Sequence, residues 1–78
     1  MKIRVFTTTT CSDCLRAKRF LEANQVPFEE VNIDDSPEAA DMVMSKNNGK
    51  RSVPAIEIDG VFHANPPIAE LAGLVGLA

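Results

Sequence analysis

The sequence contains no tryptophan or tyrosine, and its aromatic side chains are four phenylalanines and one histidine. Three of the phenylalanines, Phe6, Phe20 and Phe28, fall at positions expected in the core, so no stacking platform for nucleic-acid bases remains. Basic residues (8) are fewer than acidic residues (11), and the net charge is −3 at pH 7. This charge balance gives no attraction to a phosphate backbone, and we expect no nucleic-acid partner.

Long apolar runs are also missing. The longest covers residues 71–78, whereas a membrane-spanning helix needs about 20 apolar residues. The segment 1–6 contains Arg4 and lacks the apolar stretch of a signal peptide. Because 45% of the residues are hydrophobic, a compact core is expected. We therefore expect one cytoplasmic, monomeric domain over residues 1–78, without membrane contact.

Only two cysteines are present, Cys11 and Cys14, and two residues separate them. A disulfide closing so short a loop stabilises a fold by at most about 2 kcal/mol on the loop-entropy model. The pair therefore calls for a chemical explanation. Structural zinc usually takes four Cys or His ligands, and the single histidine, His63, cannot complete such a site within one chain. We expect no metal site in the monomer.

Hydrophobic periodicity predicts the order βαβαββα. Alternating or β-branched runs indicate strands, whereas apolar residues spaced by three and four positions indicate helices. Ser36 and Asn65 are predicted to cap helices, and Asp59-Gly60 is typical of a two-residue hairpin turn. The predicted strands cover residues 2–6, 28–33, 55–58 and 61–63, and the predicted helices cover 14–24, 37–46 and the segment after 65. The fold class is then α/β, a three-layer sandwich around a four-stranded mixed sheet.

The cysteine pair follows a strand and opens a helix. The free N–H groups and positive dipole end of a helix favour a thiolate over a thiol, and the thiolate is the species that attacks disulfides. Cys11 is expected to be exposed and to attack, whereas Cys14 lies on the buried stripe and resolves the mixed disulfide. Arg16 and Lys18 add positive charge nearby.

Three further segments are candidate substrate contacts. A cis Val53–Pro54 bond would present the Val53 backbone to an extended peptide; the local sequence favours an ordinary trans bond, because only about 5–6% of X–Pro bonds are cis. Asn65-Pro66 opens a helix that could hold an anion, or is simply a stiff helix start, which is the favoured interpretation. Arg51 could bind a substrate carboxylate, although a solvated charge is the commoner case.

Taken together, the motifs resemble those of glutaredoxins in the thioredoxin-fold superfamily, and most closely the mycoredoxins. The matching motifs are Thr7-Thr8-Thr9-x-Cys11-x-x-Cys14, Ala39-Ala40-Asp41-x-Val43-Met44-Ser45-x-Asn47-x-Gly49, Val53-Pro54, Asp59-Gly60 and Asn65-Pro66. The resemblance implies a thioredoxin fold, a cis peptide before Pro54 and a nucleophilic Cys11. It also implies a cradle for a small thiol around Val53 and the last helix. The expected substrate contacts are Thr10, Ser12, Asp13, Arg51, Ser52, Val53, Pro54, Asn65 and Pro66.

The sequence thus predicts a dithiol–disulfide oxidoreductase that acts on disulfide-containing proteins. No bound cofactor is expected. Ser12-Asp13 replaces the Pro-Tyr pair usual in glutaredoxins, and residues 63–67 replace their Gly-rich glutathione motif. The reductant therefore stays open among glutathione, mycothiol and a thioredoxin-reductase-type enzyme. Two alternatives remain: a dimeric module binding zinc or an iron–sulfur cluster, and a redox-sensing domain that binds a partner through Leu15 and the Val53 edge.

Overall fold

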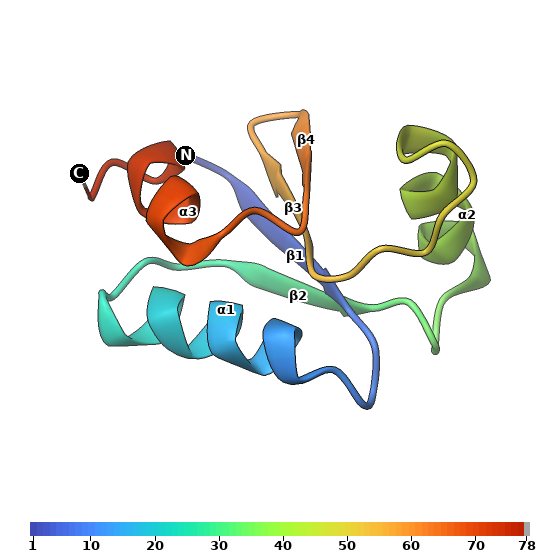
Figure 1. Ribbon diagram of the computed structural model, residues 1–78, viewed down its shortest axis with the longest axis horizontal. Helices are drawn as coiled ribbons and strands as arrows, with labels where there is room; N and C mark the ends of the chain where they lie inside the picture. Colours follow the sequence, from blue (N-terminus) through green and yellow to red (C-terminus); the bar gives the residue numbers. More distant parts are fainter. Residues whose placement is uncertain (78) are drawn as a thin grey trace.

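In the computed structural model, which describes residues 1–77, three helices pack against a four-stranded sheet (Figure 1). The elements are β1 (Ile3–Thr7), α1 (Ser12–Ala23), β2 (Glu29–Asn32), α2 (Pro37–Lys46), β3 (Ala55–Ile58), β4 (Val61–Ala64) and α3 (Ile68–Leu74). This order confirms the predicted βαβαββα arrangement, and most bounds differ from the predicted ones by one or two residues. No helix within residues 1–77 combines the length and apolarity that crossing a bilayer requires.

The sheet is mixed, with the strand order β2-β1-β3-β4. Strands β1 and β2 are parallel, as a crossover through α1 requires. Strand β3 pairs antiparallel with β1 and with β4. The turn between β3 and β4 is Asp59-Gly60, and both residues have positive φ, 48° and 88°. These angles match the tight hairpin turn whose twist suits the flanking strands.

Alternation along β1 divides the core into two halves. Ile3 and Val5 face α1 and α3, and Phe6 faces α2 on the opposite side of the sheet. Figure 1 shows α2 on the far side of the sheet from α1 and α3. The first half contains Ile3, Val5, Ala17, Leu21, Ile56, Ile58 and Leu71, and the second contains Phe6, Ile33, Ala40, Val43 and Ala55. The predicted three-layer sandwich is therefore present.

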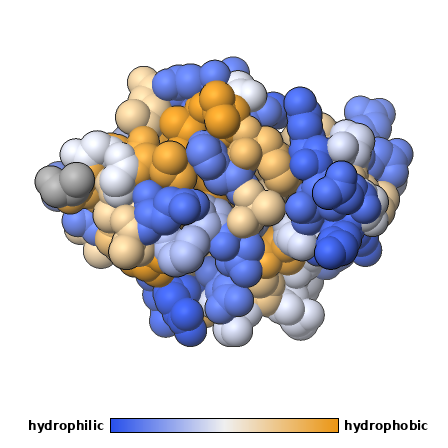
Figure 2. Space-filling view, turned by 45° about the horizontal axis from the view of Figure 1, so that its top comes forward, coloured by the Kyte–Doolittle hydropathy of each residue, from blue (hydrophilic) through white to orange (hydrophobic). Residues whose placement is uncertain are grey.

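Few large hydrophobic side chains remain at the surface. The exposed ones among residues 1–77 are Met1, Leu15, Val61 and Leu77. On the face shown in Figure 2, apolar areas are interrupted by hydrophilic residues. Phe6 is buried as predicted, but Phe20 and Phe28 are only partly buried against the first half of the core. These two rings lie at the margin of the core.

The predicted cap of the last helix is wrong. Pro67, not Asn65, occupies the N-cap position of α3, and no side chain caps the helix. A residue that precedes proline is disfavoured in the helical region, so neither Asn65 nor Pro66 can begin the helix. Asn65 instead adopts a φ of 42° and donates its backbone N–H to the Pro54 carbonyl at 2.8 Å. This bond ties the start of α3 to the segment that precedes β3.

Replacing Leu21 with alanine tests the packing of α1. Leu21 is fully buried, and its truncation should lower the free energy of unfolding by about 2–5 kcal/mol. The matched control is Leu15→Ala on the same helix, at a side chain that is 43% exposed, and it should change this free energy by less than about 1 kcal/mol. Urea unfolding of the reduced proteins measures both. Equal losses would contradict the assigned orientation of α1.

Candidate active site

Cys11 is the N-cap residue of α1. It has extended backbone angles, φ −144° and ψ 104°, and its Sγ accepts the backbone N–H of Cys14 at 3.0 Å. The Cys11 carbonyl accepts the N–H of Leu15 at 3.2 Å, which is the first full helical turn. The helix therefore begins at Ser12, which confirms that the cysteine pair opens it, and the Cys11 sulfur occupies the position that a Ser or Asp oxygen usually takes.

Cys11 and Cys14 form a disulfide, with their Cα atoms 5.2 Å apart. Cys14 is 2% exposed, whereas Cys11 is partly exposed beside the surface. This difference in burial confirms the expectation from the helical periodicity. Only Cys11 can be reached by a large substrate.

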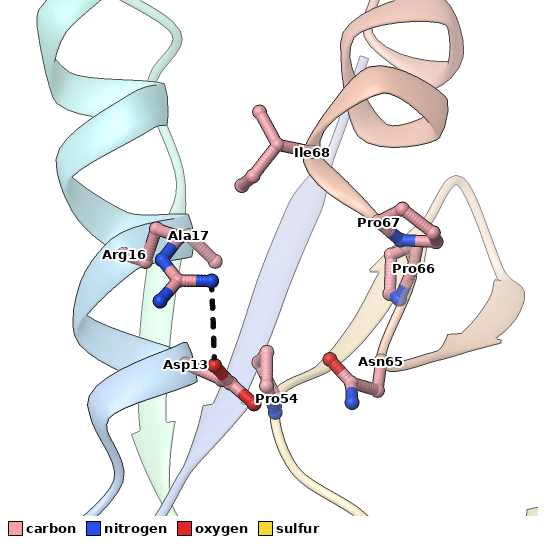
Figure 3. A pocket seen from close by; sticks show the side chains of 8 residues that line it. All are labelled: Asp13, Arg16, Ala17, Pro54, Asn65, Pro66, Pro67 and Ile68. Atoms are coloured by element: carbon pink, nitrogen blue, oxygen red, sulfur yellow. Dashed lines mark ion pairs between the residues drawn. The ribbon is translucent and has the colours of Figure 1, made fainter.

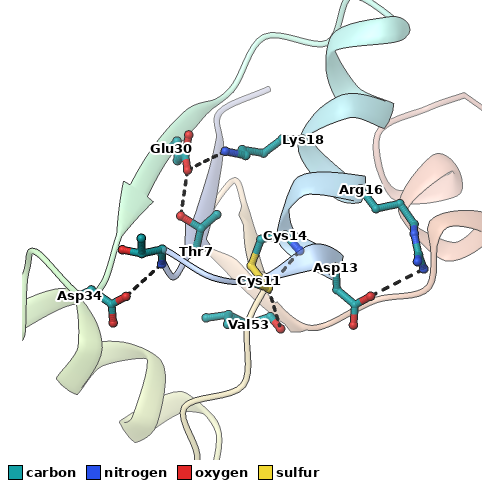
Figure 4. Close-up of a disulfide and its surroundings, with 10 residues drawn as sticks. Thr7, Cys11, Asp13, Cys14, Arg16, Lys18, Glu30, Asp34 and Val53 are labelled. Atoms are coloured by element: carbon teal, nitrogen blue, oxygen red, sulfur yellow. Dashed lines mark hydrogen bonds and ion pairs between the residues drawn. A yellow bond between two sulfur atoms is a disulfide. The ribbon is translucent and has the colours of Figure 1, made fainter.

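The Val53–Pro54 peptide bond is cis. This confirms the expectation from the family resemblance, and it shows that the preference for trans drawn from local sequence was wrong. The Val53 carbonyl oxygen lies 3.9 Å from Cys11 Sγ (Figure 4). Within residues 1–77, Val53 makes no backbone hydrogen bond through its N–H or C=O. An extended chain bound to Cys11 would find both groups available.

A pocket of about 210 Å³ opens beside the cysteines, between the starts of α1 and α3 (Figure 3). Its lining residues are Asp13, Arg16, Ala17, Pro54, Asn65, Pro66, Pro67 and Ile68. Four of the predicted substrate contacts, Asp13, Pro54, Asn65 and Pro66, therefore share one cavity. Asp13 and Arg16 form an exposed ion pair at 3.6 Å, so the charged part of the lining is electrically balanced.

The remaining predicted contacts lie elsewhere. Thr10 and Ser12 are neighbours of Cys11, and Ser52 precedes Val53; Thr10 and Ser12 are exposed and Ser52 is half-buried. Arg51 forms an ion pair with Asp34, with Nη2 and Oδ1 separated by 3.1 Å. Its guanidinium thus already contacts a carboxylate of this chain.

A polar network behind the cysteines was not identified from the sequence. The buried Thr7 hydroxyl donates to Glu30 Oε2 at 2.9 Å, and Lys18 Nζ lies 3.0 Å from the same oxygen (Figure 4). The signal for it is the alternation of β1, which places the polar Thr7 on the same face as Ile3 and Val5. A buried hydroxyl needs a partner, and Glu30 on the adjacent strand is within reach.

The charges around the cysteines are largely paired. Arg16 faces Asp13, and Lys18 faces Glu30. The Lys18 ammonium, followed by the Thr7 hydroxyl, lowers the pKa of Glu30. Since both cations have carboxylate partners, we expect a Cys11 anion to be stabilised mainly by the Cys14 N–H and the positive end of α1.

No group of three or more His, Cys, Asp or Glu side chains within residues 1–77 is arranged to hold a metal ion. Coordination by Cys11 and Cys14 would need further ligands from outside this part of the chain.

Comparison with known proteins agrees with this geometry. The family model described as Glutaredoxin matches residues 3–63. A Mycobacterium tuberculosis protein named for the glutaredoxins is 40% identical, with 97% of this chain and 93% of that protein covered. Among solved structures, the thioredoxin-like protein BC3987 has a TM-score of 0.83 at 32% identity, covering 94% and 99% of the two chains. The glutaredoxin-like protein NrdH-redoxin of Escherichia coli has a TM-score of 0.73 at 30% identity, covering 82% of each chain.

Replacing Lys18 with methionine tests the network at Glu30. Loss of the ammonium should raise the pKa of the Glu30 carboxyl toward its ordinary value of 4.5, as followed by NMR titration of its side chain. A carboxyl whose folded-state pKa is lowered stabilises the fold above its unfolded-state pKa and loses that contribution as the pH falls through the folded-state value. The stability difference between wild type and Lys18→Met should therefore shrink below pH 4.5.

The matched control is Lys46→Met in the last turn of α2, which removes the same charge on the other side of the sheet. It should leave the Glu30 titration unchanged. Equal shifts in the two variants would mean that the overall charge, rather than the contact with Lys18, sets the pKa of Glu30.

Proposed function

The chain belongs to the glutaredoxin family, and we propose that it is a dithiol–disulfide oxidoreductase that reduces disulfides through Cys11 and Cys14. The observation that carries this proposal is the bond between a partly exposed sulfur at the start of a helix and a shielded sulfur one turn behind it. A structural disulfide over so short a loop would contribute little stability.

The first step uses the reduced protein. The Cys11 thiolate attacks one sulfur of a substrate disulfide, forms a new S–S bond to it and expels the other sulfur as a thiolate. The Cys14 N–H, which points at the Cys11 sulfur at 3.0 Å in the disulfide form, would stabilise an anion in the same place. Bonds from backbone N–H groups to an anion are among the stronger hydrogen bonds.

The second step releases the substrate. The Cys14 thiol loses its proton to solvent or to the departing sulfur, and the resulting thiolate attacks Cys11 Sγ. The mixed disulfide breaks, the substrate leaves as a thiolate, and Cys11–Cys14 becomes the disulfide. Two electrons have then passed from the dithiol to the substrate. Because Cys14 is 2% exposed, external disulfides do not compete for it.

An extended segment of the substrate would lie across Val53. The N–H and C=O of this residue pair with no other backbone group within residues 1–77, and its carbonyl lies 3.9 Å from the reacting sulfur. Pairing with these two groups is strand addition, in which the backbone supplies the affinity. Such recognition suits many protein disulfides, because the hydrogen bonds are made to the substrate backbone and do not depend on particular side chains.

For the electron donor we propose a thioredoxin-reductase-type enzyme rather than glutathione. Arg16 and Arg51 already face Asp13 and Asp34, so a carboxylate-bearing thiol would compete with partners in the chain. Pro66 and Pro67 supply no backbone N–H at the pocket. The E. coli NrdH-redoxin, 30% identical, is described as having a thioredoxin-like activity profile.

Substitution of the two cysteines is expected to have different effects on disulfide reduction. Cys11→Ser should abolish all disulfide reduction, because no exposed nucleophile remains. Cys14→Ser should lose the reduction of protein disulfides but retain exchange with small mixed disulfides, since an external thiol can then resolve Cys11. Insulin reduction and turnover of a mixed disulfide with glutathione measure the two activities. Full activity of Cys11→Ser would refute the assigned roles.

Parallel assays distinguish the electron donors. The oxidised protein is offered thioredoxin reductase, glutathione with its reductase, and mycothiol with its reductase, and NADPH consumption is followed. The thioredoxin reductase reaction is expected to be the fastest. A faster reaction with glutathione or mycothiol would overturn the proposed electron donor, but the proposed oxidoreductase activity would still be supported. Absence of NADPH consumption with all three would count against the oxidoreductase itself.

A further inference from the structure

Two loops carry the groups that meet at the reacting sulfur. Residues 8–11 connect β1 to α1 and bring Cys11, and residues 50–54 precede β3 and bring Val53. The two loops approach each other where Cys11 Sγ lies 3.9 Å from the Val53 carbonyl oxygen. Whatever sets the spacing between these loops also sets the space for a substrate.

The Asp34 carboxylate bridges the two loops. Its Oδ2 accepts the backbone N–H of Thr9 at 2.9 Å, and its Oδ1 lies 3.1 Å from Arg51 Nη2. Thr9 is two residues before Cys11, and Arg51 is two residues before Val53. Figure 4 shows the bond from Asp34 to the loop that leads into Cys11. Each oxygen of one carboxylate therefore holds a different loop.

The position of Asp34 is itself fixed. Asn32 accepts the Asp34 backbone N–H at 2.9 Å and donates its side-chain amide to the Thr9 hydroxyl at 3.3 Å. The parallel pairing of β1 with β2 explains this meeting, because parallel strands end at the same edge of a sheet. The Thr9 N–H lowers the pKa of Asp34, with a smaller contribution from Arg51, so the carboxylate is charged at neutral pH.

We propose that Asp34 is a positioning residue, which holds the Cys11 and Val53 loops at the spacing that admits an extended disulfide substrate. This inference rests on the proposed function and adds a residue to it that makes no contact with the reacting sulfur. It also assigns Arg51 a different task from carboxylate binding: the guanidinium anchors the Val53 loop to Asp34.

Kinetics with a neutral substrate, bis(2-hydroxyethyl) disulfide, isolate positioning from charge recognition. Asp34→Ala should lower kcat/KM by about tenfold, because small misplacements of a reacting group are costly. Most of this loss should appear as a higher KM, since the changed spacing of the two loops misplaces the bound substrate, while the bond from the Cys14 N–H to Cys11 Sγ is kept. The matched control is Asp35→Ala, the same change at the next residue of the same connection, which should stay within about twofold of wild type.

Two further variants keep the test decisive if Asp34→Ala proves unstable. Asp34→Asn keeps an oxygen for the Thr9 N–H but loses the ion pair, and it should fall between wild type and Asp34→Ala. Arg51→Ala should also raise KM for the neutral disulfide, and the double variant should be no worse than Asp34→Ala alone. Urea unfolding of each variant confirms that it is folded during the assay.

The outcomes separate the two proposals. If the wild-type protein reduces no disulfide, the proposed function is wrong. If the wild-type protein is active and Asp34→Ala has the same kcat/KM as Asp35→Ala, only the positioning role of Asp34 is overturned. An Arg51→Ala defect that appears only with a carboxylate-bearing disulfide, such as oxidised glutathione, also overturns it, because Arg51 would then contact the substrate directly.

Discussion

The bond from the Cys14 backbone N–H to Cys11 Sγ is the contact on which the rest of the site depends. It makes the sulfur of Cys11 the cap of α1, and so aims the unpaired N–H groups of the helix at the atom that carries negative charge during exchange. The same turn of helix places Cys14 on the buried side. One local geometry thus separates the two cysteines by exposure and places their sulfurs within bonding distance.

The sheet supplies the surroundings of that helix turn. Parallel pairing of β1 with β2 brings Thr9 and Asp34 to one edge, and antiparallel pairing of β1 with β3 brings Val53 to the same end. The reacting sulfur therefore lies where three loops converge above the ends of the strands. The nearby charges are paired in several cases, as with Asp13 and Arg16. We therefore expect backbone groups, rather than charged side chains, to supply most of the substrate recognition.

Local patterns were sufficient for most of the fold. The alternation of Ile3 and Val5 predicted β1, and Asp59-Gly60 predicted the hairpin, because both depend on neighbouring residues only. The start of α3 was misplaced, since a cap candidate was preferred over the restriction that consecutive prolines impose. The cis bond at Pro54 was inaccessible to local reasoning and came from the family resemblance. The contacts of Asp34 depend on segments brought together by the sheet, which no local pattern encodes.

The central claim is that the start of α1 stabilises a thiolate on Cys11. Its direct test is the pKa of the Cys11 thiol, measured in the Cys14→Ser variant by ultraviolet absorbance of the thiolate and by the pH dependence of alkylation. The account predicts a value clearly below about 8.5, the ordinary value for free cysteine. A value at or above that of free cysteine would contradict it.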